Sequence, residues 1–315
     1  MEEKKVVKKA TREGYAEALK ELAQSPDVIV MDADLGAATK SLTFKKFAPE
    51  RFFDAGIAEA NMMGVAAGLA TCGKTVFVSS FAMFATGRAY EQIRNSIAYP
   101  NLNVKICASH AGISVGEDGA SHQCIEDISL MRSIPNMVVI NPADVVEAKA
   151  AVLEAAHHEG PVYVRLGRLA IPTVFNESYR FRIGKGQVLA EGDDVTIIAT
   201  GLMVDEALQA KDILAKQGIS ARIVNMATIK PIDKSLVIES AKKTGCIVTA
   251  EEHSVIGGLG SAVAEVLSEE YPTPLVRVGV DDTFGESGPA WELLKKYGLS
   301  AENIAKNAAI AIAKK

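Results

Sequence analysis

Apolar and polar positions follow two alternating patterns along the chain. Short runs rich in β-branched residues read DVIVMDAD, TVFVSSF, NVKICASH, MVVINPAD and PVYVRLGR in the first half, and VTIIATG, ARIVNMATI, GCIVTAEEH and PLVRVGVDD in the second. Such runs are typical of strands buried on both faces of a parallel sheet. Amphipathic stretches such as MVDEALQAKDILAKQG separate them and predict crossover helices. The pattern therefore predicts an α/β protein.

The alternation is interrupted after Arg168. The passage LAIPTVFNESYRFRIGKGQVLAEGDD contains Pro172 and three glycines in polar surroundings, which is typical of a linker. A chain of 315 residues is also long enough to form two cores. We predict a first domain over residues 1–175, a linker over 176–187 and a second domain over 188–315, each with a mostly parallel sheet flanked by helices.

The composition indicates a globular protein that acts on small molecules. Hydrophobic residues make up 48% of the chain, and the net charge of −5 arises from mixed acidic and basic residues, which argues against a nucleic-acid-binding face. The N-terminal stretch MEEKKVVKKATREGY is charged, and no window approaches the roughly 18 consecutive apolar residues that a membrane span needs. We expect a cytoplasmic protein without nucleic-acid or membrane partners.

The cysteines and one glycine-rich segment show little sign of chemistry. Cys72, Cys107, Cys124 and Cys246 are scattered without CxxC spacing, so we expect buried free thiols. The segment GGLGSA is only weakly similar to a dinucleotide-binding fingerprint, because Val263 stands where the third glycine should be. We interpret its glycines as the opening of a helix beside a strand.

The stretch SHAGISVGEDGASHQ, residues 109–123, is the strongest candidate for a site. It follows the apolar run NVKICA and so leaves the end of a buried strand, where ligand-binding groups collect. Its three glycines make a pliable backbone that carries His110, Glu117, Asp118 and His122. The alternative is a surface loop whose polar side chains meet only water.

A second candidate lies in FFDAGIAEANMMGVAAGLA, where Gly64 and Gly68 share one face of a helix that can pack closely. Glu59 stands near the start of this helix. It either complements the helix dipole, or it is held among apolar neighbours, where desolvation favours the neutral form and allows proton exchange near neutrality.

Two phenylalanines follow the next strand. Phe81 and Phe84 are three residues apart and face the same way if a helical turn begins there. They are either core residues or two rings that cover a flat heterocycle.

Taken in order, these segments resemble the transketolase family. DADL, AGIAEANMMGVAAGLA, SSFAMFATGRAYEQIR, SHAGISVGEDGASHQ, PVYVRLGR and AEEHSVIGGLGSA extend over most of the chain, and GEDGxxHQ is the most specific block. The resemblance is to the C-terminal half of transketolase. It implies a pyrimidine-binding domain of the thiamine diphosphate-binding fold, followed by a transketolase C-terminal domain.

The resemblance also assigns roles around the cofactor. Glu59 matches the glutamate that hydrogen-bonds the aminopyrimidine ring of thiamine diphosphate and so activates the cofactor for proton removal. Phe81 and Phe84 match the aromatic residues that stack on that ring, and Asp34 is grouped with the cofactor-binding residues. Gly87 stands where the family usually has a tyrosine, so one wall of the ring pocket is missing.

Substrate contacts are implied for four residues. His110 matches a residue near the substrate phosphate, Asp118 one that recognises an aldose hydroxyl, and His122 a catalytic residue that contacts the ketose hydroxyls near the reacting carbon. Arg168 matches a phosphate-binding arginine. Ala38 replaces a phosphate-contacting serine, for which Thr39 is a weak substitute.

A partner subunit is implied as well. Enzymes of this type hold the diphosphate and Mg²⁺ or Ca²⁺ through a GDG segment and a later asparagine, and this sequence has no such segment, since EDG at 117–119 belongs to the sugar-facing loop. We therefore expect no metal ligands in this chain. An N-terminal transketolase subunit is expected to supply that site, in an assembly of two copies of each chain.

The implied activity is transfer of a two-carbon ketol unit between ketose and aldose phosphates in the pentose phosphate pathway. The alternatives are a β subunit of a 2-oxo acid dehydrogenase, an enzyme similar to deoxyxylulose phosphate synthase, and a non-catalytic scaffold subunit. GEDGASHQ and LGR favour sugar phosphates, and retention of Glu59, both phenylalanines and both loop histidines argues against a scaffold.

Overall fold

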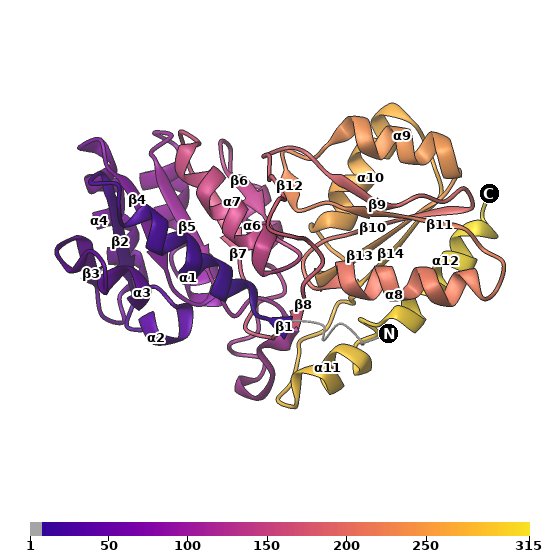
Figure 1. The fold of residues 1–315 in the computed structure, drawn as a ribbon, viewed down its shortest axis with the longest axis horizontal. Coiled ribbons are helices and arrows are strands. Elements are labelled where there is room, and N and C mark those ends of the chain that lie inside the picture. The colour runs from indigo at the N-terminus through magenta and orange to yellow at the C-terminus, as the bar shows by residue number, and fades with distance from the viewer. Residues whose placement is uncertain (1–7) are drawn as a thin grey trace.

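The computed structural model describes residues 8–315, which form two α/β domains side by side (Figure 1). The strands are β1 Lys8–Lys9, β2 Val28–Asp32, β3 Phe52–Asp54, β4 Thr75–Ser79, β5 Val104–Ala108, β6 Val138–Ile140, β7 Val162–Arg165, β8 Ile171–Pro172, β9 Gln187–Ala190, β10 Val195–Ala199, β11 Ala221–Asn225, β12 Thr228–Lys230, β13 Ile247–Ser254 and β14 Leu275–Val280. The α-helices are α1 Thr11–Leu22, α2 Gly36–Thr39, α3 Leu42–Lys45, α4 Glu59–Thr71, α5 Tyr90–Gln92, α6 Asp127–Arg132, α7 Val145–His157, α8 Met203–Ala215, α9 Lys234–Thr244, α10 Leu259–Glu270, α11 Ala290–Lys296 and α12 Ala301–Ile312. Shorter turns are the 3₁₀ helices η1 Pro49–Arg51 and η4 Ile113–Asp118 and the π-helical segments η2 Met83–Arg88 and η3 Ile93–Ala98.

The first domain is a seven-stranded sheet between two helical layers. The strand order is β12-β6-β7-β5-β4-β2-β3, and all neighbours are parallel except β12 and β6. Helices α1 and α7 pack on one face, whereas α4, η3 and α6 pack on the other. Strands β2 and β5 are buried along their whole length, as expected for strands of a parallel sheet covered on both faces. The one lysine of β5, Lys105, is buried as well and donates to the His158 and Gly160 carbonyls.

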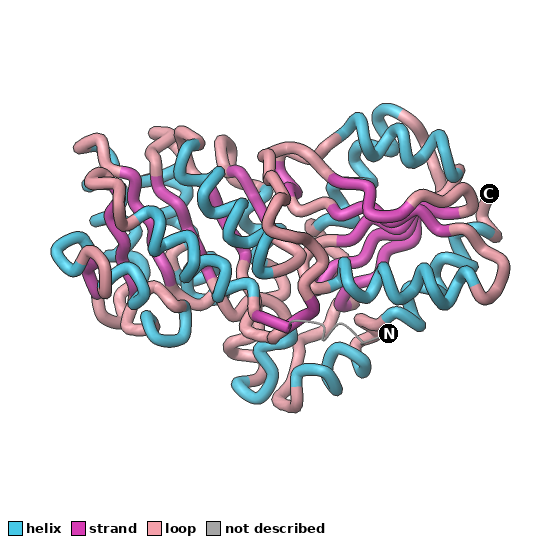
Figure 2. The backbone as a smooth tube through the Cα atoms, viewed as in Figure 1, coloured by secondary structure: helices cyan, strands magenta, loops and turns pink. Residues whose placement is uncertain are grey.

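The second domain repeats this layered plan with five strands. The order is β14-β13-β10-β11-β9, and only β9 is antiparallel to its neighbour. Helices α8 and α12 cover one face and α9 and α10 the other, which Figure 2 shows as helical layers around the sheet. The predicted fold class, two α/β domains with mostly parallel sheets, is confirmed.

One predicted strand is divided between the two sheets. The run ARIVNMATI forms β11 in the second sheet and then β12, which pairs antiparallel with β6 of the first sheet. The crossing occurs at two adjacent residues: the Met226 amide donates to the Ala199 carbonyl, and the Ala227 carbonyl accepts from the Asn141 amide. Apolar character alone could not indicate which sheet each half of the run joins.

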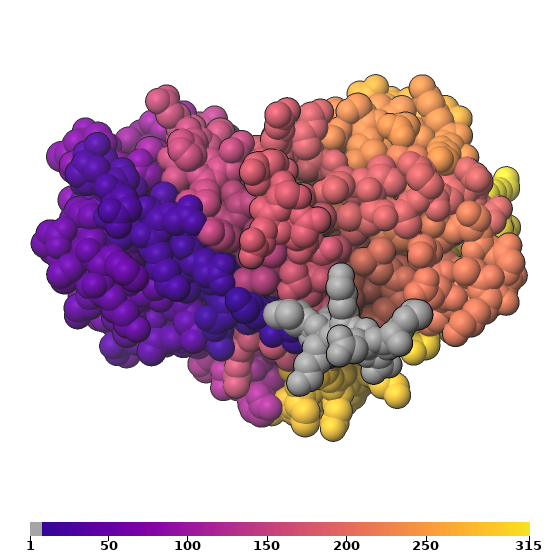
Figure 3. Space-filling view, viewed as in Figure 1, coloured from indigo at the N-terminus to yellow at the C-terminus, as the bar shows by residue number. Residues whose placement is uncertain are grey.

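The connection between the domains is held by hydrogen bonds. Residues 173–186 contain neither helix nor strand, and they lie on the surface between the domains (Figure 3). Asp144 caps helix α7 and also accepts from the Val174 and Phe175 amides. The Tyr179 hydroxyl donates to Glu147, which also accepts from the Asn225 side chain of the second domain. The Gly186 amide donates to Asp233 of the second domain, so the linker is bound to both domains.

Two local expectations have different outcomes. Cys107, Cys124 and Cys246 are buried free thiols, but Cys72 is exposed just after the last turn of α4, so the prediction of burial is wrong for it. The face of α4 that carries Gly64 and Gly68 is exposed, and nothing packs against it within the described residues. Across residues 8–315, no helix has both the length and the apolar character needed to cross a membrane.

Candidate active site

The site forms where β4 and β5 end. Just past the strands, Phe81 and Ser109 still form a parallel bridge, and the Ala82 amide donates to the Ser109 carbonyl at 2.8 Å. This pairing brings the segment after β4 beside the loop 109–123. As a result, the rings of Phe81 and His110 stack with centroids 3.8 Å apart.

Four of the predicted site residues form one aromatic cluster. The rings of Phe81 and Phe84 are nearly parallel with centroids 6.0 Å apart, and His122 meets the edge of Phe84 at 5.2 Å. Phe81 is buried, with His110 against its ring, whereas Phe84 is only partly buried. Phe84 is therefore the ring with surface left to cover a flat heterocycle.

Glu59 begins helix α4 and is 1% exposed. Its Oε2 accepts from Arg88 Nη1 at 2.8 Å, and its Oε1 is 3.3 Å from the Ser80 hydroxyl. The predicted setting of apolar neighbours is therefore incomplete, because a guanidinium compensates the buried charge. The same guanidinium lies 4.7 Å from the centroid of the Phe84 ring, which links Glu59 to the aromatic cluster.

The π-helical segment η2 places Arg88 at this position. A π turn holds one residue more than an α turn, and such bulges are frequent at functional sites. The terminal methyl group of Met83 occupies the space that a Cβ at Gly87 would take, so no side chain at position 87 reaches the cluster where the family has a tyrosine. The side chain that approaches the cluster from this turn is Arg88 instead.

His110 is held as a neutral imidazole. Burial lowers its pKa to about 3, and the nearby positive charges of Arg12 and Arg168 act in the same direction. Its Nδ1 is 2.8 Å from the Ser109 hydroxyl, and its Nε2 is 3.3 Å from Arg12 Nη1. Since a guanidinium only donates, the hydrogen-bond network assigns the proton to Nδ1. The positive charge beside His110, where the family resemblance places the substrate phosphate, belongs to Arg12 and Arg168.

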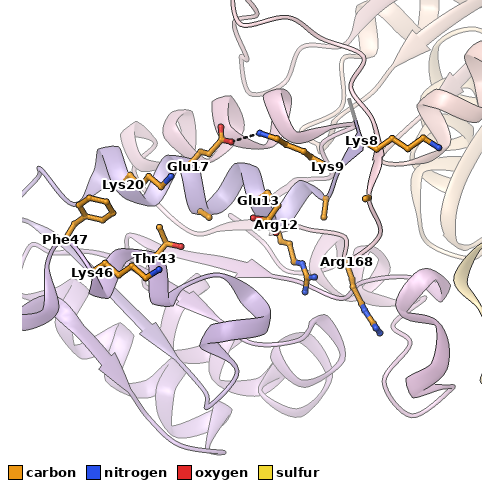
Figure 4. Close-up of a pocket in the computed structure, with 13 residues that line it drawn as sticks. Lys8, Lys9, Arg12, Glu13, Glu17, Lys20, Thr43, Lys46, Phe47 and Arg168 are labelled. Carbon is orange, nitrogen blue, oxygen red and sulfur yellow. Dashed lines mark hydrogen bonds and ion pairs between the residues drawn. The ribbon is translucent and has the colours of Figure 1, made fainter. Parts of the chain in front are cut away.

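Arg12 is a candidate that sequence reasoning missed. It lies in the first turn of α1, donates to the Ala38 carbonyl at 2.9 Å, and has a buried Nε without a hydrogen-bond partner among the described residues. A cation in the first turn opposes the helix dipole, and this was the available sequence signal. Figure 4 shows the side chains of Arg12 and Arg168 extending in the same direction.

A basic groove of about 710 Å³ extends from these two arginines along α1. Its charged lining consists of Lys8, Lys9, Arg12, Glu13, Glu17, Lys20, Lys46 and Arg168. Six of the eight charges are positive, which favours an anionic ligand at the arginine end.

Arg168 meets the acidic part of the loop. Its Nη1 donates to the Val115 carbonyl at 2.8 Å and lies 3.6 Å from Asp118 and 3.7 Å from Glu117. All three charged side chains are at least one-third exposed, so these ion pairs contribute little stability. They do place Asp118 and Arg168 next to each other.

The segment after β2 is less closely connected to the cluster. Asp34 is exposed, and its amide donates to Asp54 Oδ1 at 3.0 Å, but no hydrogen bond or ion pair among residues 8–315 joins it to Glu59. Thr39 is buried and donates to Asp32 Oδ2 at 2.7 Å. Its hydroxyl is thus already bonded and does not replace the serine missing at Ala38.

The glycines of the segment GGLGSA are explained by contacts within the chain itself. Helix α10 begins at Leu259, as predicted, and the Glu251 carboxylate accepts from the Leu259 and Gly260 amides at 2.7 and 2.8 Å. A Cβ at Gly258 would overlap this carboxylate. The helix N-terminus that a phosphate would need is occupied by the protein's own Glu251 carboxyl group. The described part of the chain also shows no group of three or more His, Cys, Asp or Glu side chains arranged to hold a metal.

Comparison with known proteins decides the family. The family "Transketolase, pyrimidine binding domain" matches residues 7–173, and "Transketolase, C-terminal domain" matches residues 184–304. The chain belongs to the transketolase family. It corresponds to the C-terminal section of transketolase, in which these two domains follow each other.

Several relatives of this transketolase chain are nearly coextensive with it. The "Putative transketolase C-terminal section" of Methanocaldococcus jannaschii is 56% identical over 304 residues, 95% of both chains. The 6-deoxy-6-sulfo-D-fructose transketolase subunit of Clostridium sp. (strain MSTE9) is 49% identical over 298 residues, 94% of this chain and 92% of that protein. The solved structure "Split gene transketolase, inactive beta4 tetramer" has 57% identity and a TM-score of 0.89, and covers 96% of this chain and 98% of that chain.

Proposed function

We propose that this chain is the C-terminal subunit of a two-component, thiamine diphosphate-dependent transketolase. With an N-terminal subunit that holds the diphosphate and Mg²⁺ or Ca²⁺, it would transfer a two-carbon ketol unit between ketose and aldose phosphates in the cytoplasmic pentose phosphate pathway. The observation that carries the proposal is a row of contacts across the ends of β4 and β5. It runs from Glu59 through Arg88 to Phe84 and His122, and from there through Phe81 and His110 to Arg12.

The residues at one end of this cluster fit an aminopyrimidine ring. Phe84 offers a partly exposed ring, and Glu59 Oε1 has only one long contact and retains acceptor capacity. Thiamine diphosphate supplies a nucleophilic carbon that accepts the ketol unit when it is bound. Glu59 would accept a hydrogen bond from the ring and exchange a proton with it, while Phe84 orients the ring.

The other end fits a hydroxylated anion. His122 lies against Phe84, nearest the reacting carbon, and would contact ketose hydroxyls there. Neutral His110 and Asp118 would bind hydroxyls farther along, and Arg12 and Arg168 would bind the anionic tail through their guanidinium groups. A small 2-oxo acid has no group for this second end, which disfavours the dehydrogenase alternative.

The tail itself is a phosphate or a group of similar charge. The arginine pair would bind either a phosphate or a sulfonate, and the relative from Clostridium sp. is named for a sulfo-sugar. We favour the phosphate because a dianion gains more from two guanidinium groups.

Partner dependence has a separate basis. The sequence lacks the GDG segment expected for the diphosphate and metal site, and the similar split transketolase of known structure is named as an inactive tetramer of one subunit. We propose that this chain alone is inactive, and that the active assembly contains two copies of each subunit.

The test is reconstitution. The chain alone, the subunit co-purified with it from its host, and their mixture should be assayed for thiamine diphosphate binding and ketol transfer. Only the mixture should be active. Asp118→Ala should then lower kcat/KM for hydroxylated acceptors by a factor that corresponds to about 2 kcal/mol of transition-state stabilisation. The loss for deoxy acceptors should be far smaller. Oxidation of pyruvate by the mixture would assign the chain to the dehydrogenases instead, and strong cofactor binding by the isolated chain would contradict the need for a partner.

A further inference from the structure

Arg88 contacts both groups proposed to bind the pyrimidine ring. Its Nη1 is 2.8 Å from Glu59 Oε2, and its guanidinium carbon is 4.7 Å from the Phe84 ring centroid. The Arg88 side chain is half exposed, whereas that of Glu59 is 1% exposed. A partly solvated, flat cation therefore lies against the buried carboxylate and the aromatic ring at the same time.

The contact gives the two oxygens of the Glu59 carboxylate different hydrogen-bond partners. Oε2 has a short, charge-assisted bond to Arg88, whereas Oε1 has only the 3.3 Å contact with the Ser80 hydroxyl. Fixing Oε2 stops rotation of the carboxyl group about its last torsion. Oε1 is then held in one direction and keeps a lone pair for an additional donor.

The backbone explains why this residue occupies the position. The wide turn of η2 ends at Arg88, and Gly87 has no side chain to cover Phe84. The Met83 methyl group fills the space next to Gly87. The Arg88 guanidinium consequently covers Phe84 where an aromatic wall was expected.

We propose that Arg88 is a positioning residue of the cofactor site. It orients Glu59 so that Oε1 faces the ring, and it forms the wall over Phe84 that Gly87 cannot form. This inference rests on the proposed function and deepens it, because it names a residue that prepares the site before the cofactor binds.

The first test measures cofactor affinity in the reconstituted complex. Calorimetry with thiamine diphosphate and Mg²⁺ would compare wild type, Arg88→Ala, Arg88→Lys and the control Arg94→Ala, which removes an exposed arginine from the adjoining segment η3. Arg88→Ala should raise the Kd roughly ten- to a hundredfold, the size known for groups that orient metal-binding side chains. Arg88→Lys should recover part of the loss, and Arg94→Ala should match wild type.

Chemical rescue separates positioning from a merely structural role. Because the native guanidinium is half exposed, methylguanidinium added to the Arg88→Ala complex should enter the vacated space and lower the Kd again. A variant damaged only in its fold would not respond. Should Arg88→Ala fail to fold, Arg88→Gln retains most of the side-chain volume without the charge and replaces it in the measurements of cofactor affinity and of unfolding.

The second test uses the free chain and needs no cofactor. In urea unfolding, Arg88→Ala should change the unfolding equilibrium constant several-fold less in a Glu59→Gln background than in wild type, because the two side chains interact. Additive effects, or a Kd that Arg88→Ala leaves unchanged or lowers, would overturn the role of Arg88. A wild-type complex that does not bind thiamine diphosphate would instead overturn the proposed function.

Discussion

Two loops of this molecule each begin at the carboxyl end of a parallel strand, and only one of them has the features of a site. Loop 109–123 follows β5 in the first domain, and residues 255–258 follow β13 in the second; both are rich in glycine and leave the carboxyl end of a parallel strand. In the second domain, the Glu251 carboxylate accepts from two amides of α10 and closes the loop. In the first domain, the carboxylates nearest to Arg168 are 3.6 and 3.7 Å away, compared with 2.7 and 2.8 Å between Glu251 and the two amides. Arg12 has no ion pair with a carboxylate among the described residues, and its Nε has no hydrogen-bond partner there.

The difference shows that a ligand-binding site requires functional groups whose hydrogen bonds and charges are not already satisfied within the chain. Both loops contain glycine and follow a parallel strand, so neither feature identifies a ligand-binding loop. The contrast extends to two buried glutamates. Glu251 is fully committed to the backbone of α10, whereas Glu59 keeps an oxygen with a single long contact. Isosteric substitutions of these two residues should therefore have opposite consequences.

The largest effect is expected from Glu59→Gln. The substitution preserves shape but removes the group that we propose exchanges a proton, so exchange of the cofactor C2 proton in the reconstituted complex should slow by about 10²- to 10⁴-fold. Proton exchange followed by NMR at saturating cofactor measures this directly. Glu251→Gln is the matched control, whose complex should exchange at the wild-type rate, and an unchanged rate in Glu59→Gln would exclude the proposed role.

Glu251→Gln should act on stability. The amide group of Gln places a donor against one of the two helix amides and leaves a buried N–H unsatisfied, which costs about 2 kcal/mol. Burial raises the pKa of Glu251 to about 7, so its contribution is fully present below pH 4.5, the unfolded value, and is lost as pH rises through 7. Urea unfolding should thus show a larger penalty at pH 5 than at pH 8. Equal stability of the two proteins at pH 5 would show that the loop is not closed in this way.

The two loops and the two glutamates also show how far the sequence could predict the fold and the site. The long apolar runs located nine strands, because strands buried on both faces need little context. The short edge strands β9 and β12 were not found, since the partner sheet decides whether they form. Glu59 and Phe84 were found through family motifs, but the contact of Glu59 with Arg88 spans 29 residues and depends on a π turn that no propensity indicates.

A smaller effect is expected from the two arginines beside loop 109–123, where we propose that the anionic tail of the substrate binds. Arg12→Ala and Arg168→Ala should each raise KM for phosphorylated substrates about tenfold with little change in kcat, because a phosphate remote from the reacting carbon is bound equally in the ground and transition states. Steady-state kinetics with phosphorylated and unphosphorylated acceptors would measure this. Lys46→Ala, farther along the same groove, is the control. Equal losses for both kinds of acceptor would remove the arginines from the phosphate site.

The smallest effect concerns how His110, in loop 109–123, makes the stability of the chain depend on pH. Burial lowers the pKa of His110 to about 3, from 6.5 in the unfolded chain, so between these values the unfolded state binds more protons than the folded state. The contribution of His110 is therefore present above pH 6.5 and is lost as pH falls towards 3. From pH 6.5 to 5.5 this costs the free chain about 1 kcal/mol, which a His110→Gln variant should not lose. Urea midpoints of both proteins across this interval give the difference in slope. Parallel curves would mean that His110 takes up a proton in the folded chain as readily as in the unfolded one, and that it carries positive charge at the anionic end of the site alongside Arg12.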